Sequence, residues 1–134
     1  MPIFVAIGGT GGASGTTVSL NFIIDGGGSA ITTGIKGDIV VDFACEIQSV
    51  TLLADQAGSI KVDIWKDTYA NFPPDNGDTI TGGAEPEIAA ATKDYDATLV
   101  GWTTSISSGD ILRVNVDSAA TVERVTLSLE LLKT

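Results

Sequence analysis

The chain has 134 residues, 43% of them hydrophobic, so its length fits one domain and its composition favours a packed core over a disordered chain. Seventeen acidic residues against seven basic ones give a net charge of −10, which repels phosphate backbones and anionic headgroups. We therefore expect neither nucleic acid nor a membrane as a partner. Histidine, the commonest general base and transition-metal ligand, is absent from the sequence. We expect no enzyme, no cofactor, and no catalytic or metal-binding residue.

Residues 1–17 divide into a short apolar arm and a spacer rich in Gly, Ser and Thr. The arm contains Ile3, Phe4, Val5 and Ile7, and the composition of the spacer is typical of a flexible tether. Two hypotheses stay open: the arm docks on a neighbouring subunit or a larger assembly, or it forms the first strand of the domain's own sheet. The sequence shows neither a signal peptide nor the run of about 18 apolar residues that spans a bilayer, so we expect synthesis in the cytoplasm.

Hydrophobic alternation with period two predicts a single all-β domain over residues 18–134. The expected strands are 18–22, 39–43, 47–54, 60–66, 99–104, 111–116 and 122–131. The turn residues 56–59 predict a hairpin between 47–54 and 60–66, whose Ile60, Val62 and Ile64 face one way and whose Lys61, Asp63 and Trp65 face the other. About eight short strands indicate an antiparallel two-sheet β-sandwich of jelly-roll type, preceded by a short extended N-terminal arm.

The stretch from Asp67 to Asp94 is expected to be a long irregular connection, because it holds three of the four prolines. A brief helical turn over 85–92 is the alternative for its second part. Aromatic residues gather near its start, where Trp65, Tyr69, Asn71 and Phe72 form a candidate recognition loop for sugars or proteins. The competing interpretation is that these rings pack the connection onto the sandwich.

Seven of the seventeen acidic residues lie in expected turns, where aspartate caps backbone groups. These residues are Asp25, Asp38, Asp55, Asp75, Asp78, Asp110 and Asp117. The segment 75–78 is the nearest candidate for a calcium loop, but a plain turn explains it better because it is too short for a dedicated motif. Cys45 is the only cysteine, so no internal disulfide can form, and its apolar setting predicts a buried thiol.

Three segments resemble a small β-rich module of tailed-bacteriophage virion structural proteins. They are residues 24–31, the stretch from 62–67 through 69–74, and residues 101–102 with 109–112. The resemblance implies a role in virion structure and attachment, no catalytic residues to carry over, and homotrimers. In such proteins the module often ends a longer tail-fibre chain, and the absence of a long shaft here favours a capsid decoration or head-fibre protein.

The sequence therefore predicts a structural protein on the virion surface, most simply a capsid decoration (cement) or head-fibre protein. Its expected partners are further copies of itself and the major capsid protein or another virion protein. The alternative is a receptor-binding module of a tail fibre or tail tip, recognising carbohydrate through residues 65–74. An enzyme acting on a cell-surface polymer would need a carboxylate pair that the sequence does not reveal.

Overall fold

A computed structural model describes residues 4–7, by their backbone alone, and residues 13–134. Within these residues the fold is all-β, as the alternation predicted, with one 3-10 turn at Asn76–Asp78 and no α-helix. The strands are β1 (Phe4–Ile7), β2 (Thr17–Asp25), β3 (Gly34–Val41), β4 (Cys45–Asp67), β5 (Glu87–Asp96), β6 (Ser105–Ile106), β7 (Asp110–Ala120) and β8 (Arg124–Lys133). No helix in the described part of the chain is long and apolar enough to cross a membrane.

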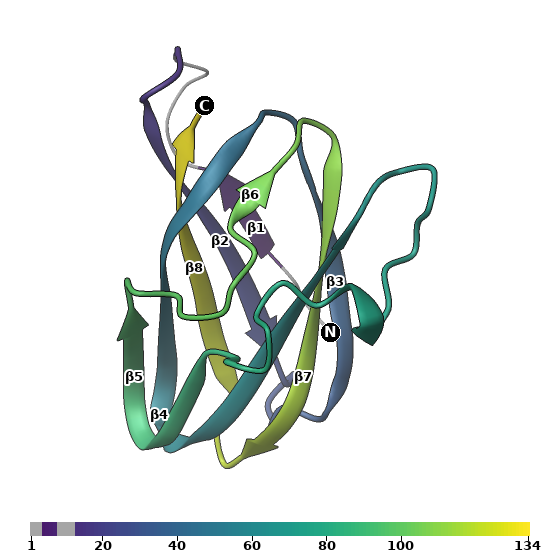
Figure 1. Ribbon diagram of the computed structural model, residues 1–134. Coiled ribbons are helices and arrows are strands. Elements are labelled where there is room, and N and C mark those ends of the chain that lie inside the picture. The colour runs from purple at the N-terminus through teal and green to yellow at the C-terminus, as the bar shows by residue number, and fades with distance from the viewer. Residues whose placement is uncertain (1–3, 8–12) are drawn as a thin grey trace.

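The strands form one antiparallel sheet that curls around its own core (Figure 1). Its order is β1-β2-β8-β4-β7-β3, and β5 and β6 pair with β4 beside this path. The long strand β4 runs through both halves of the curl, since it pairs with β8 along Cys45–Ala54 and with β7 along Ser59–Asp67. The two halves of the sheet are therefore joined covalently through the continuous strand β4.

The other long segments bend at the same end of the molecule as β4. Strand β7 ends at Ala120 opposite Ser59, and β8 begins opposite Ala54 and continues along β4. Strand β2 likewise ends beside β8, and β3 continues beside β7. In Figure 1 these bends lie together at the bottom of the molecule, where the sheet folds over. This curl brings the inner faces of the two halves together.

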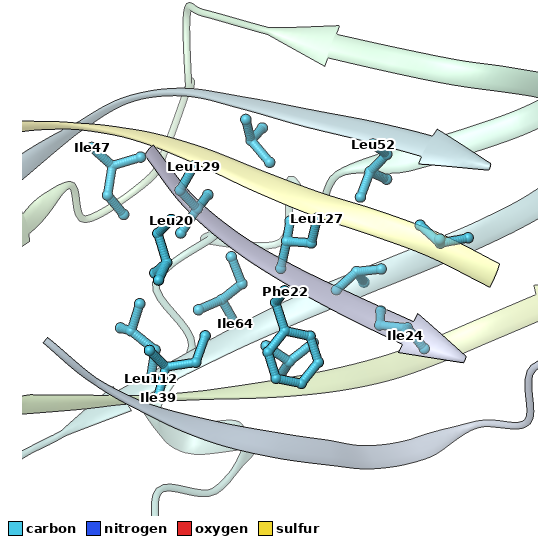
Figure 2. Close-up of a cluster of buried hydrophobic side chains, with 14 of the residues drawn as sticks. Leu20, Phe22, Ile24, Ile39, Ile47, Leu52, Ile64, Leu112, Leu127 and Leu129 are labelled. Atoms are coloured by element: carbon cyan, nitrogen blue, oxygen red, sulfur yellow. The ribbon is translucent and has the colours of Figure 1, made fainter. Parts of the chain in front are cut away.

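A single hydrophobic core lies between these inner faces. Alternate residues of β2 and β8 enter it from one half, and Figure 2 shows Phe22 and Leu127 directed toward Ile64 and Leu112 of the other half. The core residues of the β2–β8 and β4–β7 ladders are Val18, Leu20, Phe22, Ile24, Ile60, Val62, Ile64, Leu112, Val114, Val116, Val125, Leu127, Leu129 and Leu131. Each large side chain of this kind contributes about 1.5–3 kcal/mol when it leaves water, so burial in this interior is what holds the curl closed.

The predicted hairpin at residues 56–59 is wrong, because the chain continues through it as part of β4. Gly58 does not provide a turn conformation there. A Cβ atom at this position would lie 2.6 Å from the carbonyl oxygen of Ala120 and 2.9 Å from Cγ1 of Val122. Glycine at this point instead lets β4 approach the break between β7 and β8. The inward orientation predicted for Ile60, Val62 and Ile64 is confirmed.

Two further expectations about the second half of the chain need correction. Residues 87–96, expected to be irregular or briefly helical, form strand β5 against β4. The reason is tertiary pairing, since the Ala, Lys and Asp residues of β5 have low strand propensity and most of its side chains are exposed. Residues 99–104, expected to be a strand, form a turn at 100–101 and otherwise irregular backbone, and the strand pairing with β4 is limited to Ser105–Ile106.

The N-terminal arm lies in the sheet of its own chain in this structure. Phe4–Ile7 pairs antiparallel with Leu20–Ile23 of β2, so β1 is the terminal strand of the sheet. This backbone arrangement agrees with the hypothesis that the arm forms the first strand of the domain's own sheet. Ile3 lies outside the described residues.

Candidate functional site

Three carboxylates meet on the outer face of the sheet, on the side opposite the core. Asp63 comes from β4, Asp117 from β7, and Glu85 from the segment that leads into β5. One oxygen from each lies within 4.8 Å of the others. Strand pairing explains the first two, because Asp63 lies opposite Asn115 and Asp117 points the same way two residues later.

Asp63 is the buried member of this cluster, with 7% of its surface exposed. Its Oδ1 accepts hydrogen bonds from the Ile64 backbone N–H at 2.8 Å, from Thr79 Oγ1 at 2.6 Å and from Thr81 Oγ1 at 2.9 Å. Its Oδ2 accepts one from Trp65 Nε1 at 3.0 Å. The carboxylate therefore fastens the connection after β4 to the outer face of the sheet.

Glu85 and Asp117 are the more accessible members of the cluster. Burial, together with the negative charges of Asp63 and Asp117, raises the pKa of the Glu85 carboxyl. Asp117 accepts a hydrogen bond from Asn115 Nδ2 at 2.7 Å. Three carboxylates at this spacing are ligands that a hard cation such as Ca²⁺ accepts. The Oδ1 atom of Asp63 is already committed to three donors, so its principal role is structural.

The candidate recognition loop is divided by the structure into a packed and an exposed part. Trp65 is only 8% exposed, and its indole N–H is taken by Asp63. Tyr69 is 84% and Phe72 is 43% exposed. Phe72 covers the guanidinium of Arg113, with 5.1 Å between that group and the ring centroid.

Polar contacts at the base of the loop fix its shape. Asn71 Nδ2 donates to Asp67 Oδ1 at 3.2 Å, and the backbone N–H of Thr68 donates to the same oxygen at 2.7 Å. Arg113, under Phe72, forms a bidentate pair with Asp38 through bonds of 2.7 and 3.0 Å. Of the four residues predicted for this loop, Tyr69 and Phe72 are thus presented to solvent, Asn71 shapes the turn and Trp65 packs.

Charge is distributed very unevenly along the chain. Every Asp, Glu, Lys and Arg lies between residues 25 and 134, so residues 1–24 carry no charged side chain. These 24 residues include β1 and all of β2 except its last residue, Asp25. The terminal edge of the sheet formed by β1 and β2 is therefore uncharged in a chain of net charge −10.

The other two sheet edges carry charges and irregularities. Strand β3, at the far end of the strand order, exposes Ile35 and Val40 but carries Lys36, Asp38 and a bulge between Ile35 and Gly37. Strand β5 carries Glu87, Lys93, Asp94 and Asp96 and is bulged opposite Gly58. Charges and bulges of this kind prevent edges from pairing with other chains.

Comparisons of the chain with protein-family models, with curated proteins and with solved structures find no match. The functional argument therefore depends on the residues described above.

Sequence reasoning missed the carboxylate cluster and the uncharged edge. Asp117 was placed in a turn but lies in β7, and Glu85 had no predicted partner. A search for acidic residues on the outward positions of neighbouring strands would have paired Asp63 with Asp117, had the pairing of β4 with β7 been known. The uncharged N-terminal segment could have been found directly, by plotting charge along the chain. The turn at 75–78 is confirmed: Asp75 caps the 3-10 turn, with Gly77 N donating to its Oδ1 at 2.8 Å.

Proposed function

We propose that the chain is a structural protein of a virion surface, of the capsid decoration or head-fibre kind, that acts as a homo-oligomer. The observation that carries this proposal is the contrast between one uncharged sheet edge and an otherwise strongly acidic chain. Such a contrast suits a protein that contacts its neighbours through one side and stays soluble and mutually repelling elsewhere. The proposal includes a two-sheet sandwich of jelly-roll type, in which the two halves of the curled sheet are the two layers.

The segments that resemble phage virion modules support the proposal by where they lie. Residues 24–31 form the end of β2 and the turn that follows it, and residues 69–74 form the exposed loop after β4. Most residues of these two segments are accessible to solvent. Packing of the core does not determine which amino acids stand at accessible positions, so the resemblance there does not follow from the β-sandwich fold alone. A shared surface is consistent with a shared role in assembly, and the homotrimer that the resemblance implies is part of the proposal.

Electron cryo-microscopy of a purified particle tests this proposal. Density for the domain at the local symmetry axes of the capsid, with residues 1–17 against the shell or a neighbouring copy, would support it. Removing residues 1–15 should then leave the domain folded and abolish its incorporation. Density at the tail tip would instead favour attachment, and particles that lack the chain would overturn both assignments.

A receptor-binding module is the second candidate, favoured by the exposure of Tyr69 and Phe72 on one fixed loop. Exposed aromatic rings supply rigid contact area for sugars and proteins. A glycan array should then show saturable binding that is lost in Tyr69→Ala. Tyr95→Ala is the matched control, because Tyr95 is 65% exposed on β5, away from this loop. Equal binding by both variants, or none by the parent protein, would exclude this candidate.

A further inference from the structure

The edge formed by β1 and β2 is the place where a second copy of this chain can approach without charge repulsion. The residues that pair in the β1–β2 ladder, Phe4–Ile7 and Leu20–Ile23, include no charged residue. At a net charge of −10 per copy, contacts through the β3 or β5 edge would bring like charges together. Among the three edges, electrostatics thus favours the one that ends in β1.

β1 is held to this edge by a short ladder. It pairs along four residues with β2, which is nine residues long, and Thr17–Ser19 of β2 pair with β8 but not with β1. A four-residue terminal strand that pairs on one side only belongs to the low-stability end of a fold, where local opening costs least.

The connection between β1 and the body of the domain is long enough to reach another copy. Among the described residues after β1, Gly15 is tied to the sheet by its backbone N–H, which donates to the carbonyl oxygen of Lys133 at 2.7 Å. The eight residue steps from Ile7 to Gly15 reach about 27 Å when extended. Five of the residues from 8 to 15 are glycine.

We propose that copies of this chain associate by exchanging β1, so that Phe4–Ile7 of one copy pairs with Leu20–Ile23 of the next. This inference rests on the self-association included in the proposed function. The exchanged ladder has the same register and the same hydrogen bonds as the ladder within one chain, so the exchange sacrifices no backbone pairing. Each copy gives one strand and receives one, so a closed ring of copies would leave no β2 edge open.

Disulfide trapping in the observed register tests the exchange. Ala6 and Asn21 are directly opposed in the β1–β2 ladder, and Asn21 lies between the inward-facing Leu20 and Phe22, so Asn21 faces away from the core. We would co-express an Ala6→Cys chain and an Asn21→Cys chain that carry different tags, and oxidise the purified protein. The native thiol does not interfere, because burial raises the pKa of Cys45 to about 11 and leaves almost no thiolate near neutral pH.

The expected result is a disulfide-linked product that contains both tags, formed wherever an Ala6→Cys chain gives its β1 to an Asn21→Cys chain. A matched control replaces Asn21→Cys with Thr33→Cys, an exposed position between β2 and β3, and should give no such product. A variant lacking residues 1–12 should be monomeric by light scattering.

Three outcomes would overturn the exchange. Oligomers in which the Ala6→Cys/Asn21→Cys double variant is linked only within single chains would reject it and leave the proposed function standing. Ala6→Cys chains linked to each other would show that β1 strands pair edge to edge. A parent protein that is monomeric at every concentration would overturn the exchange together with the homo-oligomer.

Discussion

Thr81 shows how one side chain on the outer face supports the connection after β4. It is fully buried, and its hydroxyl donates to Asp63 Oδ1 at 2.9 Å. Thr81→Val keeps the shape but removes a donor from a buried carboxylate, which costs about 1–3 kcal/mol. Chemical denaturation should show this loss in the free energy of unfolding. Thr103→Val, at an exposed threonine, is the control, and an equal loss there would contradict the role given to the hydroxyl.

Glu85 makes the stability of the fold depend on pH in an unusual direction. Its pKa is raised above the ordinary value of 4.5 by burial and by the charges of Asp63 and Asp117. The folded state therefore binds this proton more tightly than the unfolded chain does, and its contribution to stability is lost as the pH rises from about 4.5 through the raised value. Glu85→Gln should be more stable than the parent protein at pH 7, by up to about 1 kcal/mol for a relieved like-charge contact.

Thermal unfolding of the two proteins between pH 4 and pH 7 checks this prediction. The difference between them should shrink as the pH falls, because the parent then becomes protonated at Glu85. Glu130→Gln is the control at an exposed glutamate on β8 that is not among the charges raising the pKa of Glu85, and it should not reproduce the gain in stability at pH 7. If the parent protein and the Glu85→Gln variant are equally stable at every pH between 4 and 7, the proximity of the three carboxylates is contradicted.

Thr121 holds a strained backbone conformation at the break between β7 and β8. Its φ is 79°, and the N–H of Val122 donates to the carbonyl of Ala120 at 3.0 Å, which together describe a γ-turn of the rare, strained kind. β-branched residues adopt positive φ only at a cost of roughly 1–2 kcal/mol. Thr121→Gly should therefore raise the free energy of unfolding by about 1 kcal/mol. The same substitution at Thr126, inside β8, should lower it, and a loss at both positions would contradict the strain.

At the scale of elements, β4 depends on the absence of a side chain where it bends. A Cβ atom at Gly58 would meet the backbone of Ala120 and the side chain of Val122. Gly58→Ala should cost about 1–3 kcal/mol, as overpacking does in other cores. Gly77→Ala is the control, because a Cβ atom there would meet only the Asp75 carboxylate, at 3.1 Å. Equal midpoints of urea unfolding for the two variants would show that the bend tolerates a side chain.

At the scale of the whole molecule, association must overcome the repulsion between acidic copies. With a net charge of −10 on each chain and an uncharged edge as the contact, salt should screen the repulsion without weakening the contact. The dissociation constant of the oligomer should fall when NaCl rises from 20 mM to 300 mM, a range over which the Debye length drops from roughly 20 Å to 6 Å. Sedimentation velocity measures this shift. Tighter association at low salt would point to ion pairs between copies and against the uncharged edge.

Much of the fold was accessible from the sequence because the inward residues alternate regularly. The period-two pattern predicted strands where β2, the second half of β4 and β8 lie, and it placed Ile60, Val62 and Ile64 on one face, which is the buried one. The apolar setting of Cys45 predicted a thiol that is 1% exposed. These features are local: a strand with one face in a core must alternate, whichever strands it pairs with. The absence of charge from residues 1–24 is equally a property of the sequence alone.

Tertiary structure alone decided how the strands are joined and which outward residues meet. A glycine between two apolar runs is typical of a turn, yet at Gly58 the chain bends and continues as the same strand. The close approach of Ala120 and Val122, and not a positive φ, requires the glycine there. The polar strand β5 forms because β4 offers it a partner. Asp63 and Asp117 come together because β4 pairs with β7, and Glu85 joins them because the chain returns to the sheet before β5. These three residues are 22 to 54 positions apart in the sequence, so no local pattern encodes their contact.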